Sequence, residues 1–363
     1  MIPISKPTIS HLEAQYVNEA VSSGWVSSLG KFIEEFEAGF AEFCGVKHCV
    51  STANGTVAIH LALKVLGIGS GDEVIVPDLT FVATANAVML AGATPVFADV
   101  QYGDWCLDPE SVKRKLSPRT KAIIPVHLYG HPSAMNELQA IAEEHRLKII
   151  EDAAEAHGAK YHGRRVGGLG DCATFSFYGN KIITTGEGGC ITTNSDEIAA
   201  RARLLRDHGM SKERRYWHTE VGYNYRMTNL QAALGVAQLE KIDYFLRERD
   251  RIFDTYKRSL LPLGFIVNPR LENTRPVNWL TCVLLPGGNR ADRDELLVNL
   301  KGQGIDTRPF FYPMTAMPIY EGEGNSVSAD LSARGLNLPT FPGLEDREIH
   351  YISEVLIKAV QSK

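Results

Sequence analysis

The chain has no apolar run long enough to cross a bilayer. Its longest apolar stretches, such as residues 83–93, are far shorter than the roughly 20 residues that a transmembrane helix needs, and they contain polar residues. The first seven residues, MIPISKP, offer neither a basic segment followed by an apolar core nor a small-residue cleavage site. The sequence therefore predicts a cytoplasmic protein with no membrane partner.

An excess of positive charge is also missing. The 38 Lys and Arg residues are outnumbered by 43 Asp and Glu residues, which gives a formal net charge of −5. Surfaces that bind nucleic acid or anionic membranes normally need a cationic excess, so we expect neither as the main partner. Arg214, Arg215 and Arg226 lack an interleaved aromatic cluster, and they favour a solvated face or a contact with a diphosphate group.

Paired cysteines are absent as well. The six cysteines are scattered along the chain without a C-x-x-C pair, and most lie in apolar runs, which favours reduced thiols in the core. His127, His131 and His157 have no carboxylate or cysteine companions at ligand spacing. We therefore predict no metal site.

What the sequence does contain is an alternation of short apolar runs and amphipathic helical patterns over most of its 363 residues. Apolar runs without polar alternation predict a mostly parallel sheet with both faces covered, hence an α/β fold. The predicted strands are residues 48–50, 73–76, 94–97, 122–126, 148–150, 173–176 and 189–192.

A long helical pattern over residues 229–260 predicts the passage into a second part of the chain. There the pattern is α+β, with a strand at 281–285 and helices at 292–301 and 346–360. We predict a large domain with an N-terminal arm, residues 1–245, and a small C-terminal domain, residues 246–363.

Residues 53–56, Ala-Asn-Gly-Thr, follow a predicted strand and open a helical pattern. The backbone amides and the helix dipole at such a place can hold a phosphate group. A turn glycine at Gly55 and a helix cap at Thr56 explain the same residues equally well.

Asp152 follows the apolar strand pattern of residues 148–150 directly. A carboxylate there is costly unless it has a cationic partner. A structural salt bridge or a helix cap would satisfy it. The functional alternative is that Asp152 holds a proton on a heterocyclic nitrogen.

Lys181 stands in a Gly- and Thr-rich turn between two predicted strands, nearly alone among apolar, small and hydroxylic residues. Burial lowers the pKa of a lysine and leaves the neutral amine that Schiff-base chemistry requires. The alternative is a loop lysine with a solvated tip.

A phosphate cradle, a strand-end aspartate and a desolvated lysine together form the set that pyridoxal 5'-phosphate (PLP) demands. The chain also resembles the DegT/DnrJ/EryC1/StrS sugar aminotransferases over nearly its whole length. The motifs that carry the resemblance are NGT at 54–56, TFVAT at 80–84, PVHLYG at 125–130, EDAAE at 151–155, SFYGNK at 176–181 and GYNYRMTN at 222–229.

The resemblance implies a fold-type I, aspartate aminotransferase-like enzyme that uses PLP. In this reading Lys181 forms the Schiff base and moves the proton, and Asp152 pairs with the pyridinium nitrogen. Phe81 stacks on the ring and Glu155 lies near the ring hydroxyl. The resemblance also assigns the cofactor phosphate to Gly55, Thr56 and Ser176, with Asn224 reaching it from the neighbouring subunit of a homodimer.

Within the family, the sequences around Lys181, at residues 215–218 and at residues 307–313 most resemble those of the GDP-perosamine synthases. This implies amino transfer from L-glutamate to GDP-4-keto-6-deoxymannose, with Arg215, Arg308 and Thr315 as candidate substrate-binding residues. Relatives usually carry a Pro-x-His-x-x-Pro motif where residues 313–318 read PMTAMP, so a threonine, Thr315, replaces the histidine.

Other functions stay open on the sequence. The substrate could be a dTDP- or UDP-linked keto-sugar, an inosose or a small keto-phosphate. A catalytically silent regulatory relative is a further alternative, which the intact pair of Lys181 and Asp152 disfavours.

Overall fold

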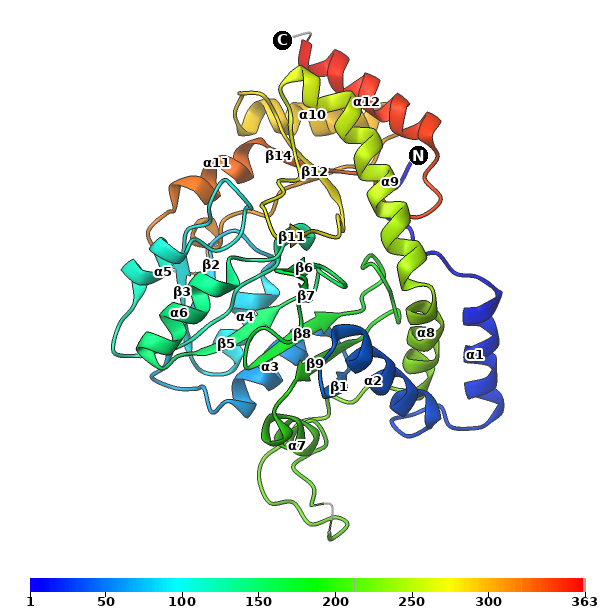
Figure 1. The fold of residues 1–363 in the computed structure, drawn as a ribbon, viewed down its shortest axis with the longest axis vertical. Coiled ribbons are helices and arrows are strands. Elements are labelled where there is room, and N and C mark those ends of the chain that lie inside the picture. The colour runs from blue at the N-terminus through cyan, green and yellow to red at the C-terminus, as the bar shows by residue number, and fades with distance from the viewer. Residues whose placement is uncertain (212, 321, 362–363) are drawn as a thin grey trace.

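The computed structural model of the chain describes residues 1–211, 213–320 and 322–361, so the last two residues of the predicted small domain lie outside it. Its largest element is a seven-stranded sheet with the strand order β1-β9-β8-β5-β4-β2-β3 (Figure 1). The strands are β1 (His48–Thr52), β2 (Glu73–Pro77), β3 (Thr94–Ala98), β4 (Thr120–Ile123), β5 (Lys148–Asp152), β8 (Cys172–Ser176) and β9 (Gly189–Thr193).

Strand β9 is antiparallel to both of its neighbours, whereas the other pairs in this sheet are parallel. The predicted mostly parallel sheet is therefore confirmed. Because every strand except β9 runs in the same direction, six carboxyl ends meet at one edge, which is where open α/β sheets bind their ligands.

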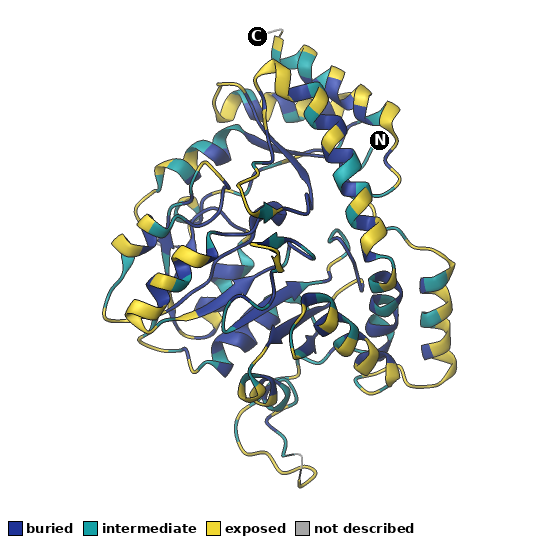
Figure 2. Ribbon diagram, in the orientation of Figure 1, coloured by how far each residue is buried: buried dark blue, intermediate teal, exposed yellow. Residues whose placement is uncertain are grey.

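Both faces of the sheet are buried, as the dark strands of Figure 2 show. Side chains alternate between two apolar clusters: Val74 and Val76 of β2 lie in one, and Ile75 between them lies in the other. This period of two follows from the strand pleat, and it explains why the strands read as continuous apolar runs.

Helices cover the two faces. On one side α3, α4 and α7 contribute to the cluster that holds Val74, and on the other α2, α6 and α8 contribute to the cluster that holds Ile75. The helices are α1 (His11–Ser22), α2 (Lys31–Cys44), α3 (Gly55–Val65), α4 (Ala83–Leu90), α5 (Pro109–Lys115), α6 (Met135–His145), α7 (Asp196–Leu205) and α8 (Asn229–Glu240).

The C-terminal part of the chain has a second, four-stranded sheet in the order β10-β12-β14-β13 and an apolar core of its own. Its strands are β10 (Ile266–Val267), β12 (Thr281–Leu284), β13 (Arg308–Pro309) and β14 (Gly335–Leu338), and its helices are α9 (Ile242–Leu260), α10 (Arg290–Gly302), α11 (Ser326–Arg334) and α12 (Asp346–Gln361). The predicted boundary between residues 245 and 246 falls inside α9 and stays a prediction.

Two local expectations differ from the structure. The predicted helix over 229–260 is divided at Lys241, whose φ of −107° and ψ of 6° separate α8 from α9. The strand expected at 122–126 ends at Ile123. Pro125 has no amide hydrogen to donate and interrupts the ladder, although Val126 still forms a bridge with Asp152.

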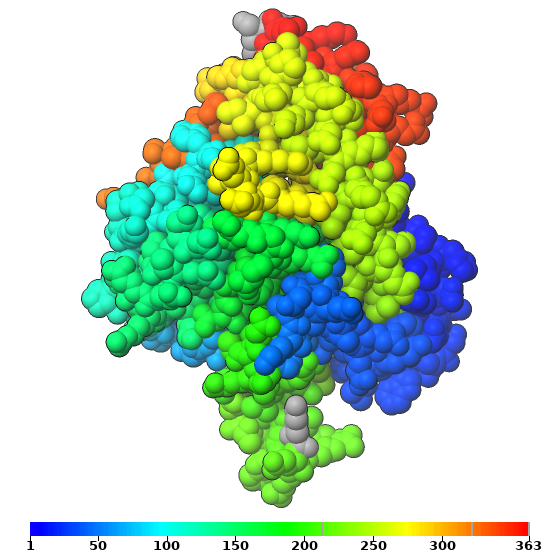
Figure 3. All heavy atoms as spheres, in the orientation of Figure 1, coloured from blue at the N-terminus to red at the C-terminus, as the bar shows by residue number. Residues whose placement is uncertain are grey.

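Two smaller features complete the fold. Strands β6 (Lys160–Tyr161), β7 (Arg164–Arg165) and β11 (Thr274–Arg275) form a short sheet that joins the two parts of the chain. The segment between α7 and α8 projects from the body, at the bottom of the view in Figures 1 and 3. In the described ranges, no helix is both long and apolar enough to span a membrane.

Candidate active site

A cavity of about 550 Å³ lies where the carboxyl ends of the parallel strands meet. Residues that follow β1, β2, β5 and β8 line it, together with two aromatic side chains from the C-terminal part of the chain. The wall includes seven residues singled out from the sequence, namely Gly55, Thr56, Phe81, Asp152, Glu155, Ser176 and Lys181.

The amino end of α3 forms one side of the cavity. Asn54 caps the helix, because its Oδ1 accepts a hydrogen bond of 3.0 Å from the Val57 amide. A Cβ added at Gly55 would lie 2.8 Å from the Ser176 Cβ, so only glycine fits beside β8. The arrangement brings a helix amino terminus, the Thr56 side chain and the Ser176 hydroxyl together in a place suited to a phosphate group.

Asp152 stands at the end of β5 and is only 5% exposed. Its Oδ2 accepts a hydrogen bond of 2.7 Å from the Thr84 hydroxyl, and its Oδ1 accepts one of 3.2 Å from the Ala154 amide. Burial raises the pKa of Asp152 above its ordinary value, and the bond from Thr84 opposes the shift. A cationic ligand at this point would favour the ionised carboxylate.

Lys181 follows β8 and points into the cavity, with 12% of its side chain exposed. Its Nζ lies 3.7 Å from Oε1 of Glu155. Burial lowers the pKa of Lys181, and the nearby carboxylates of Glu155 and Asp152 oppose that shift. Burial also raises the pKa of Glu155 to about 7. Burial therefore shifts this amine toward the neutral form that acts as a nucleophile.

Aromatic side chains form the opposite wall. Phe81 is 54% exposed, and its ring centre lies 5.7 Å from that of Phe311. Tyr129 stacks on Phe311 with the ring centres 5.4 Å apart, and its hydroxyl accepts a hydrogen bond of 3.2 Å from the Phe311 amide. The Tyr129 backbone has a φ of 51°, and its amide donates a bond of 2.7 Å to Oε2 of Glu155. A strained residue thus fixes a carboxyl group at the cavity.

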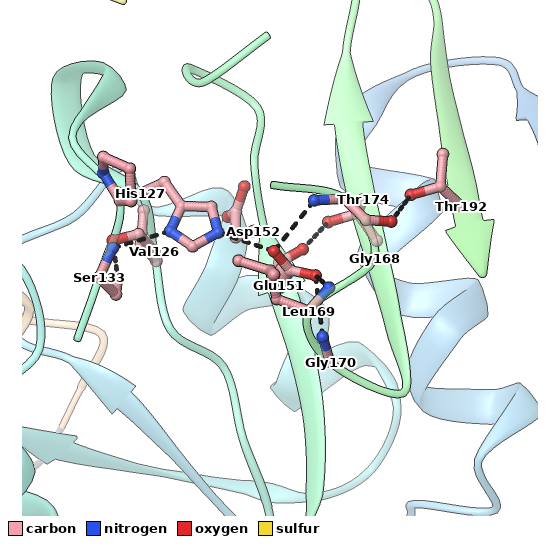
Figure 4. Close-up of polar contacts among 12 residues, drawn as sticks. Val126, His127, Ser133, Glu151, Asp152, Gly168, Leu169, Gly170, Thr174 and Thr192 are labelled. Atoms are coloured by element: carbon pink, nitrogen blue, oxygen red, sulfur yellow. Dashed lines mark hydrogen bonds and ion pairs between the residues drawn. The ribbon is translucent and has the colours of Figure 1, made fainter. Parts of the chain in front are cut away.

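The end of β5 is anchored by the buried carboxylate of Glu151 (Figure 4). Glu151 and His127 are both fully buried, and His127 Nε2 lies 3.0 Å from Oε2 of Glu151. Three backbone amides, of Gly167, Leu169 and Gly170, also donate to the Glu151 carboxylate.

The tautomer of His127 follows from these contacts. Its Nδ1 accepts a hydrogen bond of 3.0 Å from the Ser133 amide, so the proton lies on Nε2 and is donated to Glu151. Burial alone would raise the pKa of Glu151, but the hydrogen bond from His127 and those from the amides hold it below its ordinary value. The His127 amide donates to the Asp152 carbonyl at 3.0 Å, so the network fixes the backbone of Asp152.

The other predicted residues lie away from the cavity wall that the described residues form. Asn224 is exposed on the projecting segment, where its Oδ1 accepts bonds from Arg226. Arg215 is exposed on the same segment, over the ring of Tyr216. Arg308, in β13, pairs with Asp306.

Thr315 lies in a short helical turn, η3 (Met314–Ala316), and packs against the end of β2. Its hydroxyl donates a bond of 2.9 Å to Oδ2 of the buried Asp78, and its amide donates one of 2.8 Å to Oδ1. Asn325 donates a third bond, of 3.1 Å, to the same carboxylate. The residue that replaces the usual histidine therefore joins the C-terminal segment to the large sheet.

Sequence reasoning did not assign roles to three residues of the site. Thr84 lies within a motif that carried the family resemblance, but its bond to Asp152 spans 68 positions. Trp279 and Phe311 come from beyond α9, and no local pattern links them to Lys181. Only the packing of the two parts of the chain brings them to the cavity.

Comparison with known proteins agrees with this geometry. The model of the DegT/DnrJ/EryC1/StrS aminotransferase family matches residues 7–357. The chain belongs to this family. It is a PLP-dependent aminotransferase, and its predicted fold class is confirmed.

Similar proteins cover the aminotransferase almost end to end. It is 48% identical to the GDP-perosamine synthase of Caulobacter vibrioides, over 98% of both chains. It is 44% identical to the GDP-perosamine synthase of Vibrio cholerae, over 97% of both chains. Among solved structures, the PLP form of the Streptococcus pneumoniae protein Spr1654 has a TM-score of 0.95 and 26% identity, over 99% of both chains.

The cavity of this aminotransferase fits PLP. The space beside Gly55, which a Cβ would fill, suits the phosphate group. Asp152 is a buried carboxylate without a cationic hydrogen-bond partner in the described structure, so it suits a protonated ring nitrogen. The buried amine of Lys181, whose pKa burial lowers, suits the aldehyde carbon. The residues present therefore suit the phosphate, the ring nitrogen and the aldehyde of the cofactor.

Proposed function

We propose that this enzyme transfers an amino group from L-glutamate to C4 of GDP-4-keto-6-deoxymannose, giving 2-oxoglutarate and GDP-perosamine. One observation carries the proposal: the buried amine of Lys181 and the strand-end carboxylate of Asp152 share a cavity, in a chain nearly half identical to a GDP-perosamine synthase along its whole length. Bound PLP supplies an electron sink for the electrons released when a bond at the amine-bearing carbon breaks.

Each predicted cofactor residue has a proposed role that its contacts support. Gly55, Thr56 and Ser176 bind the phosphate at the amino end of α3. Asp152, fixed by Thr84, holds the proton on the ring nitrogen. Phe81 offers its exposed face to the ring.

Glu155 and Lys181 control protons on the other side of the cavity. Glu155 receives the Tyr129 amide and lies near the ring hydroxyl in this proposal. Lys181 binds the cofactor and, when substrate takes its place, carries a proton between the cofactor and the substrate carbon. Burial lowers the pKa of its amine, which favours the neutral form that can accept a proton.

A panel of keto substrates tests the proposed specificity. We expect amino transfer from L-glutamate to GDP-4-keto-6-deoxymannose with a kcat/KM at least about tenfold above that for dTDP- or UDP-linked keto-sugars, an inosose or a small keto-phosphate. The product is identified by mass spectrometry, and 2-oxoglutarate release is measured in parallel. Preference for another member of the panel would move the assignment to that substrate. No transfer to any of them, with PLP bound, would favour the regulatory alternative.

We also propose a homodimer in which Asn224 reaches the cofactor phosphate of the partner subunit. Its exposure, outside the described lining of the cavity in its own chain, supports this role. Arg215 on the same segment and Arg308 and Thr315 in the C-terminal part are proposed to act on the nucleotide sugar. For Thr315 the bonds to Asp78 support an indirect action, through the position of the segment that follows Phe311.

Mixing two inactive variants tests the shared site. Lys181→Ala and Asn224→Asp, whose added carboxylate repels the phosphate, give mixed dimers with one site that carries both defects and one that carries neither. Binomial exchange of subunits should restore about a quarter of the wild-type activity, since about half of the dimers are mixed and each keeps one intact site of two.

Co-expression with two different affinity tags isolates the mixed dimers for this measurement. Verified mixed dimers that are no more active than either parent would show that Asn224 acts within its own subunit or not at all.

We further infer a cytoplasmic location, which is supported by six buried cysteines that form no disulfide in the described structure.

A further inference from the structure

Trp279 contacts the Lys181 amine directly. The Nζ of Lys181 lies 3.9 Å from the centre of the indole ring and over its face. The same nitrogen lies 3.7 Å from Oε1 of Glu155. The amine is therefore in contact with an aromatic face and with a carboxyl group, and both attract an ammonium ion.

A second contact joins the indole to the lysine loop. The Nε1 hydrogen of Trp279 is donated to the Asn180 carbonyl, with a distance of 2.7 Å between nitrogen and oxygen. Asn180 precedes Lys181 directly, so the indole holds both the backbone and the side-chain end of this part of the loop. Trp279 itself is only 4% exposed and stacks on Tyr129, with the ring centres 6.3 Å apart.

The backbone on each side of the indole is constrained. Asn278 has a φ of 48°, in the left-handed region that few residues other than glycine adopt. Its side chain donates a bond of 3.0 Å to Oδ1 of Asp250, and the carbonyl of Trp279 accepts a bond from the buried guanidinium of Arg249. Strain that the surrounding contacts maintain at a cavity wall commonly serves the site.

We propose that Trp279 is a further residue of the catalytic site, whose indole face holds the Lys181 amine beside Glu155 and stabilises its protonated form. The role rests on the proposed function of Lys181 as the proton carrier. A carrier has to exist as the ammonium ion for part of each turnover, and burial alone disfavours that form. The indole face offsets this cost without placing another ionised group in the cavity.

The test measures the pKa of the Lys181 amine in cofactor-free protein. Reductive methylation with formaldehyde, and cyanoborohydride as the hydride donor, begins at the neutral amine. Its rate over a range of pH is measured by mass spectrometry of the peptide that contains Lys181. The probe protein carries 5-fluorotryptophan in place of tryptophan, which weakens the negative potential of the ring face and keeps its shape and its N–H group. The titratable side chains whose charge acts on Lys181 are Glu155, Asp152 and His157.

We expect fluorination to lower the pKa of the Lys181 amine by about 0.5, because a weaker face stabilises the ammonium ion less. The matched control is Trp279→Phe grown with the same fluorinated tryptophan, which labels only the other three tryptophans of the chain, and here the pKa should equal that of unlabelled Trp279→Phe. An unchanged or raised pKa in the labelled wild-type chain, or an equal shift in the control, would overturn the proposal.

This readout is independent of the sugar substrate. If the substrate panel fails while the pKa moves as expected, the proposed function fails and the contact stands. If the panel succeeds and the pKa does not move, Trp279 has no electrostatic part in the reaction.

Discussion

Replacing Lys181 with alanine is expected to lower amino transfer by at least about a thousandfold, because it removes both the covalent attachment point and the proton carrier. The fold should persist. The substitution removes the amine that lies 3.7 Å from Glu155, but the Glu155 pKa of about 7 allows this carboxyl group to take up a proton and become uncharged. Turnover is measured by 2-oxoglutarate release, and the secondary structure and unfolding temperature of the variant are compared with those of the wild type.

Lys121→Ala is the matched control, since Lys121 is an exposed lysine on β4 and lies outside the cavity wall formed by the described residues. It should retain wild-type turnover. Turnover of Lys181→Ala within tenfold of wild type would refute the role of Lys181. An unfolded variant would instead show that the buried ion pair supports the fold.

The second large effect is expected for Asp152→Asn, with a fall in turnover on the order of a hundredfold or more. The amide oxygen of asparagine can still accept the hydrogen bond from Thr84, so the side chain keeps its position. An amide is uncharged, however, and does not hold a proton on the ring nitrogen as a carboxylate does. The variant should bind PLP with an altered absorbance spectrum.

Thr84→Val distinguishes the effect of the Asp152 charge from the effect of the Asp152 position. It leaves the Asp152 carboxylate in place and removes only the hydroxyl that bonds to Oδ2. We expect a loss of about tenfold, smaller than that of Asp152→Asn. Equal turnover of Asp152→Asn and the wild type, at full PLP content, would contradict the role of Asp152.

The parts of the site that could be predicted are those with a local signature. Asp152 was recognisable because an acid directly after an apolar strand is costly without a partner, and the structure places it at 5% exposure. Lys181 stood out for the same reason, as a lysine without charged neighbours in its segment. The sheet followed from continuous apolar runs, since burial of both faces leaves no polar alternation.

The parts that could not be predicted depend on distant contacts. Helices α8 and α9 read as one because no glycine or proline separates them; Lys241, where they divide, bonds to Ser10 of the N-terminal segment. The assignment of Thr315 to the sugar substrate stays a prediction, and its bond to Asp78, 237 positions away, has no signal in the local sequence. Trp279 contacts Lys181 although the two residues are 98 positions apart, and the periodicity of the sequence cannot predict such a distant contact.

The discontinuous wall of the cavity has a thermodynamic consequence. Trp279 and Phe311 come from the C-terminal part of the chain, while Lys181 and Asp152 come from the large N-terminal part. The complete wall therefore exists only when both parts are packed together. A ligand that binds only this packed form stabilises it by mass action, by about 2.7 kcal/mol at a concentration one hundred times its dissociation constant. Saturating PLP is therefore expected to slow unfolding and proteolysis of the assembled chain.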